Sequence, residues 1–266
     1  MKNLLKADFY SLIRSKLTYI LLIICIALPV FSVLTSVLIN NIFESEIMND
    51  PEFSEIGGML FTGRSIMFSS FSLTNNTGLI IPIFIGIFTM SDIRHGTIRN
   101  KVIFGKNKRD IYLSHLIVST VFSTVMSLVC FMVSSLGLIF FDYGVPFDSK
   151  ELLSFIESLV IGILTFAYIA SVSTFFALST KFLPLTIILT IAVSLLLGIV
   201  SSATMLIGTE KYKYIFYSIP TYSLSVVTQT GGIELEIFIF GLSSYLVFIA
   251  INTILGIIIF NKTDLK

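Results

Sequence analysis

Residues 90–110 read MSDIRHGTIRNKVIFGKNKRD and separate two long apolar runs of the chain. Six Lys and Arg side chains lie in this short stretch against two Asp side chains. Short loops rich in Lys and Arg stay on the cytoplasmic side of a membrane. The stretch therefore predicts a cytoplasmic loop, and it fixes the inner ends of the two apolar runs beside it.

Six apolar runs of this kind divide the chain, which is 55% apolar and only 12% charged. A helix needs about 20 apolar residues to cross the hydrocarbon core of a bilayer. Alternate polar segments, starting with the first, hold 13 of the 17 Lys and Arg residues, whereas the segments between them hold 12 of the 16 acids. We therefore expect an all-α, multi-pass membrane protein with both termini inside and with spans at 17–39, 65–90, 111–141, 159–180, 182–207 and 237–260.

Residues 1–16 precede the first span and have the periodicity of an amphipathic helix. Such a helix lies along the inner leaflet, with its bases toward the anionic headgroups. We predict this interfacial helix, and a plain cytoplasmic extension of the first span is the alternative. The apolar face consists of Leu5, Phe9, Leu12 and Ile13. The opposite face consists of Lys6, Ala7, Ser11 and Arg14.

Residues 210–236 are too apolar for a free loop and too interrupted for a full crossing. Pro220 breaks the segment in its middle, and Tyr217 and Tyr222 suit the interfacial belt of a membrane. Backbone that turns back at membrane depth is tolerated only where it is buried in protein or lines a cavity. We predict a re-entrant outer segment of two short helices; a half-buried outer plug over the bundle is the alternative.

The cytoplasmic loop 91–110 carries local signals for a short helix. Thr97 can cap its N-terminus, and Gly105 can supply the left-handed residue that ends it. Ile98 and Val102 lie one turn apart and form a small apolar face, and Asp110 is placed to cap the third span. We predict a rigid helical peg that projects from the membrane with its apolar face exposed; an ordinary topology-setting loop is the alternative.

The sequence around this peg resembles a known family. The pattern begins with an acid, which is followed after three residues by Gly-Thr-Ile-Arg, then by a short helix and by Lys-Arg before the next span. This pattern resembles the type-2 membrane subunit of ATP-binding-cassette (ABC) exporters. The basic N-terminal helix, the six spans and the proline-broken segment before the last span agree with that family in kind. Two positions depart from it: the family commonly has Glu where this chain has Asp92, and often Lys where this chain has His115.

This resemblance implies that the chain works with partners. The 98–104 helix would dock into a groove on a separate ATPase subunit, and nearby arginines would pair with acids there or with lipid phosphates. Closure of two ATPases around ATP would push the pegs, and two six-span permeases, identical or related, would expel a substrate outward across the bacterial plasma membrane. The coupling residues that the resemblance implies are Asp92, Arg94, Gly96, Thr97, Ile98, Arg99, Val102 and Arg109.

The chain has no Gly-x-x-x-x-Gly-Lys-Ser/Thr phosphate loop, so ATP and Mg²⁺ are expected on the partner ATPase. No cofactor, metal or catalytic residue is expected on this chain. A net charge of +1 provides no overall field that would attract nucleic acid. The sequence thus predicts a permease subunit rather than an enzyme.

The predicted spans contain no Asp, Glu, Lys or Arg, and the chain has 25 Phe. Such spans suit a hydrophobic or amphipathic substrate, with an antimicrobial or other amphipathic peptide ahead of an antibiotic or a lipid. An intramembrane enzyme or an ion-coupled secondary transporter is a weaker alternative, because both need ionisable groups in a wet cavity. A non-transporting immunity or sensor protein is the third alternative.

Overall fold

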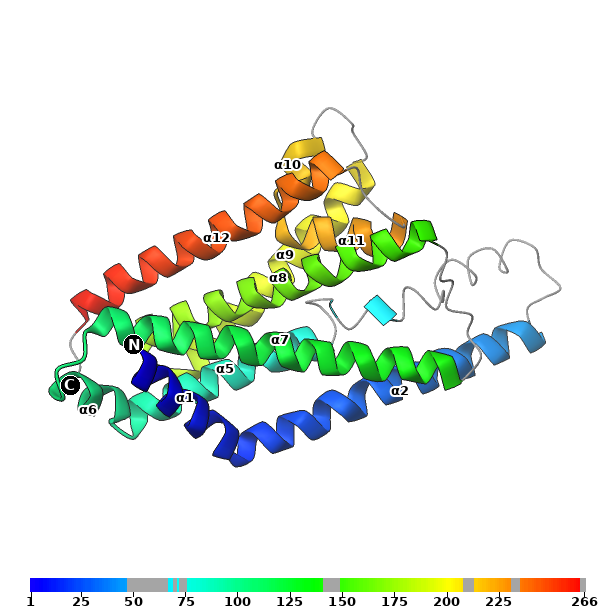
Figure 1. Cartoon of the computed structure of the whole chain (residues 1–266). Coiled ribbons are helices and arrows are strands. Elements are labelled where there is room, and N and C mark those ends of the chain that lie inside the picture. The colour runs from blue at the N-terminus through cyan, green and yellow to red at the C-terminus, as the bar shows by residue number, and fades with distance from the viewer. Residues whose placement is uncertain are drawn as a thin grey trace.

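The computed structural model describes residues 1–46, 67–68, 71, 76–140, 149–207, 213–230 and 235–263. Every regular element in this part of the chain is a helix, which confirms the all-α prediction. The helices, coloured along the chain in Figure 1, are α1 (Lys2–Arg14), α2 (Lys16–Glu46), α5 (Asn76–Arg94), α6 (Thr97–Ile103), α7 (Lys108–Phe140), α8 (Ser149–Thr180), α9 (Leu183–Ile207), α10 (Lys213–Tyr217), α11 (Pro220–Thr230) and α12 (Leu235–Lys262).

Five of these helices, namely α2, α7, α8, α9 and α12, are long and apolar enough to cross a membrane. A sixth crossing is added if α5 and α6, which meet at a bend of 54°, count as one broken span. By helix length and composition the chain is therefore a multi-pass membrane protein. Of the predicted span 65–90, residues 76–90 are helical in α5, and most of residues 65–75 lie outside the described residues.

Helix α8 occupies the centre of the bundle. In its most apolar stretch 67% of the residues are buried, against 17% in α9 and 11% in α12. It contacts α5, α7, α9, α11 and α12, and Figure 1 shows it lying between α7 and α12. The outward side chains of α9 and α12 are mostly apolar and exposed, as expected of helices whose outer face meets lipid.

Both chain termini and α6 lie at the same end of the bundle, which we call the α6 end (Figure 1). The start of α7 is tied there to the end of α12, because the Lys108 Nζ donates to the carbonyl oxygens of Asn261 and Thr263 at 3.0 and 2.8 Å. A Lys side chain on the last carbonyls of a helix satisfies groups that have no partner within the helix. The helices α10 and α11 lie toward the opposite end of α12 (Figure 1).

Helix α1 packs against α7, and this contact decides which face of α1 is buried. Leu4, Asp8 and Leu12 are almost completely buried, whereas Ile13, expected on the apolar face, is exposed. The helix is therefore amphipathic, but its inner face is rotated from the predicted one and includes a carboxylate. The periodicity of apolar residues alone does not reveal that rotation, since it depends on a partner helix far along the chain.

The segment before the last span forms two short helices, α10 and α11. Pro220 opens α11, where its fixed φ suits a first helical turn. The Tyr245 hydroxyl of α12 donates to the Pro220 carbonyl oxygen, and the Thr221 hydroxyl donates to the Leu197 carbonyl oxygen of α9 at 2.8 Å. These bonds hold α11 against the long helices.

Helix α12 packs closely on the Tyr112 side chain of α7 at Gly256. A Cβ at this position would overlap the phenol ring of Tyr112, which is completely buried. We expect Gly256→Ala to lower the free energy of unfolding by about 1–3 kcal/mol, because the two helices must move apart. Thermal unfolding of the purified protein in detergent, followed by helical circular dichroism, measures this effect.

Gly241, on the same helix, provides the matched control. A Cβ there would meet Ser223 at 3.7 Å, which is an ordinary contact. Gly241→Ala should therefore leave stability unchanged or raise it by up to about 1 kcal/mol, because Ala has the higher helix propensity. Equal loss of stability in both variants would contradict the close packing of α7 on α12.

Candidate functional site

Two glycines set the bounds of α6. Gly96 has φ of 70° and is the N-cap of the helix, and Gly105 has φ of 77° just after its end. A left-handed residue at each end suits Gly, which has no Cβ to clash. The prediction that Gly105 ends the helix is confirmed. The prediction that Thr97 caps it is wrong, because the turn at Gly96 places Thr97 inside the first helical turn.

The apolar face of α6 is turned inward. Ile98 is only 1% exposed, so the prediction that this apolar face is exposed is wrong. Helix α6 is bent by 54° from α5 and contacts α7, and this direction brings Ile98 into the apolar core. Val102 is partly buried against the same apolar cluster, which consists of Leu4, Ile98, Ile111, Tyr112, Leu116, Leu178 and Phe260.

The exposed apolar residues of α6 lie at its C-terminal end instead. Ile103 is 69% exposed and Phe104 is 82% exposed. Ile103 is the last residue of α6 and Phe104 is its C-cap, and neither belongs to the buried face of Ile98 and Val102. We call Ile103 and Phe104 the apolar tip.

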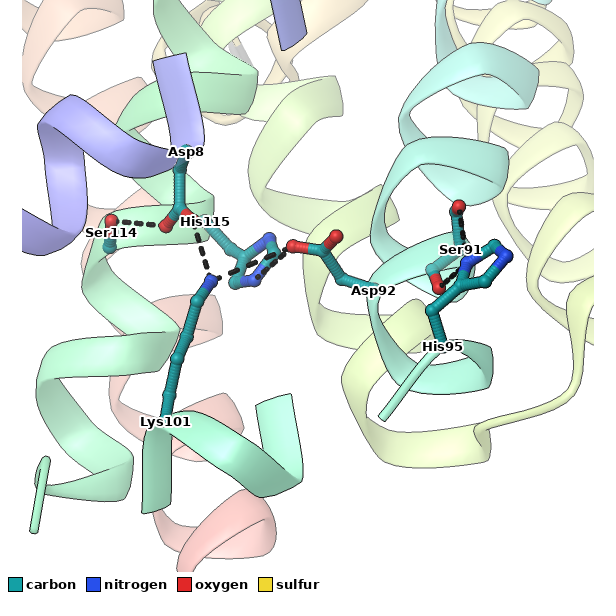
Figure 2. A network of polar contacts seen from close by, with 7 residues as sticks. All are labelled: Asp8, Ser91, Asp92, His95, Lys101, Ser114 and His115. Atoms are coloured by element: carbon teal, nitrogen blue, oxygen red, sulfur yellow. Dashed lines mark hydrogen bonds and ion pairs between the residues drawn. The ribbon is translucent and has the colours of Figure 1, made fainter. Parts of the chain in front are cut away.

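A network of charged side chains joins α6 to three other helices (Figure 2). The Lys101 Nζ of α6 lies 2.5 Å from Oδ1 of Asp8 on α1 and 3.6 Å from Oδ2 of Asp92 on α5. On α7, the Ser114 hydroxyl donates to Oδ2 of Asp8 at 2.5 Å. His115, also on α7, places its Nε2 3.4 Å from Oδ2 of Asp92. One ammonium group thus bridges two carboxylates.

The acidic and imidazole side chains of the network are almost completely shielded from solvent. Asp8 is 2% exposed, Asp92 is 8% exposed and His115 is completely buried. Burying a charge is costly unless a partner compensates for it, and the Lys101 ammonium supplies that compensation. Because Asp8, Asp92 and Lys101 belong to different helices, their pairing fixes where α1 and α5 lie relative to α6.

The sequence-based predictions did not include Asp8 or Lys101 among the functional residues. Asp8 is the one acid in an otherwise basic N-terminal segment, and it lies four residues from both Leu4 and Leu12. That spacing places it on one helical face with two buried leucines. An acid on such a face signals a buried partner, so this feature would have identified Asp8 but not the lysine that pairs with it.

The other predicted coupling residues lie around this network. Arg94, Arg99 and Arg109 are exposed, and no ion pair joins them to other described residues. Arg109 also lines a shallow, open pocket of about 510 Å³ with Asn107, Lys108, Asp110, Leu113 and Asn261. These arginines add exposed positive charge to the same loop and to the helix ends beside it.

The predicted residues of the outer segment lie elsewhere, toward the opposite end of the bundle (Figure 1). Tyr217 and Pro220 are buried, Tyr222 is partly buried, and the Tyr217 and Tyr222 rings are 5.3 Å apart in an edge-to-face contact. The structure therefore does not join them to the α6 network. They form a separate aromatic contact that packs α10 on α11.

The network can be tested for charge compensation. Lys101→Met leaves two buried carboxylates without their cation, and we expect a loss of about 3–5 kcal/mol in the free energy of unfolding. The double variant Lys101→Met/Asp8→Asn should lose less than Lys101→Met alone, because one of the uncompensated charges is gone. Thermal unfolding in detergent gives both values.

Lys106→Met provides the control, because Lys106 is exposed in the same loop. Its effect should stay within about 0.5 kcal/mol. Additive losses in the double variant would show that Lys101 and Asp8 are not energetically coupled.

Comparisons with known proteins assign no family to this chain. No protein-family model matches it, and no curated protein matches its sequence. A shared fold would not by itself define a function, because function depends on the site. The features of this chain that bear on function are therefore the α6 end and its exposed tip.

Proposed function

We propose that this chain is the permease subunit of a type-2 ABC exporter in the bacterial plasma membrane. The observation that carries the proposal is a solvent-exposed apolar tip, Ile103 and Phe104, on a short helix whose opposite face is locked into the bundle. An exposed Phe is a strong contact residue for a partner protein. The partner in this proposal is a separate ATPase subunit that binds ATP and Mg²⁺.

The proposed orientation places the α6 end in the cytoplasm, with both termini inside. The basic loop 91–110 supports this orientation through its six Lys and Arg residues. The shared position of the termini and α6 at one end of the bundle is compatible with it (Figure 1). Helix α1 then lies at the inner leaflet, where its Lys and Arg residues meet anionic headgroups.

The contact with the ATPase follows from the shape of α6. The apolar tip enters an apolar groove, and Arg94, Arg99 and Arg109 meet acids on its rim. Burial of one Phe side chain contributes about 1.5–3 kcal/mol. Ile98 and Val102, which the resemblance implies as contact residues, instead hold α6 on the permease.

Movement of the ATPase is passed on through the charged network and the apolar cluster. Lys101 ties α6 to α1 and α5, and Ile98 ties it to α7, α8 and α12. A push on the tip therefore displaces the inner ends of several helices together. In the proposed mechanism two permeases, identical or related, use this displacement to narrow a shared cavity and expel the substrate.

The proposed substrate is hydrophobic or amphipathic, such as an amphipathic peptide, an antibiotic or a lipid. The predicted spans contain no Asp, Glu, Lys or Arg, and this composition favours such a molecule over ions or sugars. Helices α10 and α11 are proposed as the re-entrant outer segment, with Tyr217, Pro220 and Tyr222 closing the outer side. A role in immunity or sensing uses the same contacts without substrate movement.

Photo-cross-linking tests the docking contact directly. A photoreactive residue in place of Phe104 should give an adduct with a protein that carries a phosphate loop and hydrolyses ATP. The same residue in place of Ile98 should give none, because Ile98 is buried. An adduct at position 98 alone, or with a protein that binds no nucleotide, would refute the proposed docking face.

A substitution tests the same contact energetically. Phe104→Asp should weaken binding of the ATPase by about tenfold or more, because the apolar contribution of the ring is lost. Asn107→Asp adds the same charge to an exposed position of the loop and should weaken binding much less. Binding of the purified ATPase to permease in lipid nanodiscs measures both effects, and equal losses would assign the effect to charge alone.

Cysteine labelling tests the orientation in a variant without Cys25 and Cys130. Lys106→Cys should react with a membrane-impermeant maleimide only after the inner side is opened. Tyr214→Cys, at an exposed position of α10, should react in intact cells, and Leu224→Cys, at a buried position of α11, should be protected. Labelling of Lys106→Cys in intact cells would reverse the proposed topology.

A further inference from the structure

Three buried side chains of the charged network have the composition of a metal site. The carboxylates of Asp8 and Asp92 and the imidazole of His115 each offer one ligand atom, and these atoms lie within 4.8 Å of one another. They come from α1, α5 and α7 and converge on one point (Figure 2). One imidazole with two carboxylates suits Zn²⁺ and related first-row divalent ions.

Within this group, the ion pairs compensate the two carboxylates but give the buried imidazole of His115 no hydrogen bond. It is completely buried, and neither of its ring nitrogens has a hydrogen-bond partner in the described part of the chain. Its Nε2 lies 3.4 Å from Oδ2 of Asp92, but outside hydrogen-bond geometry. A buried polar nitrogen without a partner is unfavourable, and a metal ion would use its lone pair.

The separation of the His115 and Asp92 ligand atoms fits a tetrahedral ion. Bonds of about 2.0–2.2 Å from zinc to nitrogen or oxygen place neighbouring ligands about 3.3–3.6 Å apart. The 3.4 Å between Nε2 of His115 and Oδ2 of Asp92 matches one edge of such a tetrahedron. Ser114 donates to Asp8 at 2.5 Å, as outer partners orient metal-ligating carboxylates.

Lys101 occupies the place of a cation in this arrangement. Its ammonium group lies 2.5 Å from Asp8 and 3.6 Å from Asp92, so it neutralises the carboxylates that an ion would bind. Its side chain is 11% exposed, and the flexible stem of a lysine allows the charged end to withdraw toward solvent. Metal and lysine are therefore alternatives for the same two acids.

We propose that Asp8, Asp92 and His115 form a site for a divalent transition-metal ion such as Zn²⁺, and that Lys101 competes with the ion for the two carboxylates. Binding of the ion releases Lys101 and with it the charged link between α6 and helices α1 and α5. Binding itself does not depend on the proposed transport function. The consequence for coupling does rest on that function, because only then does α6 receive force from an ATPase.

The test uses the full-length chain in detergent, without a polyhistidine tag and without any ATPase. Co²⁺ is the probe, since low-coordinate Co²⁺ gives strong visible absorption bands and Zn²⁺ displaces it. Lys101→Met should bind Co²⁺ at least about tenfold more tightly than the natural chain, because the competing ammonium is gone. Co²⁺ or Zn²⁺ should also raise the unfolding temperature of Lys101→Met, as any ligand of the folded state does.

The two histidines of the chain give a matched pair of controls. In the Lys101→Met background, His115→Gln should abolish the bands. His95→Ala should leave them unchanged, because His95 is exposed on the loop and its ring bonds to Ser91, away from the proposed ligands. If Lys101→Met does not fold, Lys101→Gln keeps an uncharged donor at the same place. Circular dichroism and size-exclusion chromatography check the fold of each variant.

Three results would overturn the proposal. The first is absence of Co²⁺ bands in a folded Lys101→Met or Lys101→Gln chain. The second is binding that survives His115→Gln or disappears with His95→Ala. The third is a thiolate-to-cobalt charge-transfer band, which would place the ion at Cys25 and Cys130. None of these results bears on whether α6 docks onto an ATPase.

Discussion

The arrangement of the α6 end depends on one ammonium group, that of Lys101, between the carboxylates of Asp8 and Asp92. A buried carboxylate without a partner is strongly unfavourable, so each acid must stay near this lysine. Because the acids belong to α1 and α5, the pairing restrains the positions of three helices at once. Ser114 adds α7 to the group through its bond to Asp8.

Such polar links have particular value in a bundle of apolar helices. The outer faces of α9 and α12 are exposed and apolar, so the hydrophobic effect that packs soluble cores contributes little between helices in lipid. Hydroxyl groups supply other links: Ser123 of α7 donates to the Phe166 carbonyl of α8 at 3.2 Å. At the α6 end, the charged network links the helices by ion pairs in the same way that these hydroxyl groups link them by hydrogen bonds.

Most features that neighbouring residues determine were predicted correctly, the Thr97 cap excepted, whereas those that depend on distant partners were not. The apolar runs indicated the long helices, and Gly105 indicated the end of α6, because both signals are contained in a few neighbouring residues. The burial of Ile98 depends on the 54° bend between α5 and α6. Asp8 and His115 come together only in three dimensions, so the spacing of Asp8 from Leu4 and Leu12 could indicate its burial but not its partners.

The length of α6 explains why its two faces act together. A helix of 7 residues is too short to be stable alone, because one or two turns do not offset the cost of nucleation. Its shape therefore depends on the contacts of Ile98 and Lys101 with the bundle. Phe104 is the C-cap of this helix, so in the proposed mechanism a force on that ring is passed to the residues that contact α1 and α5. A longer, independently stable helix would instead pivot on its loops and transmit less of the movement.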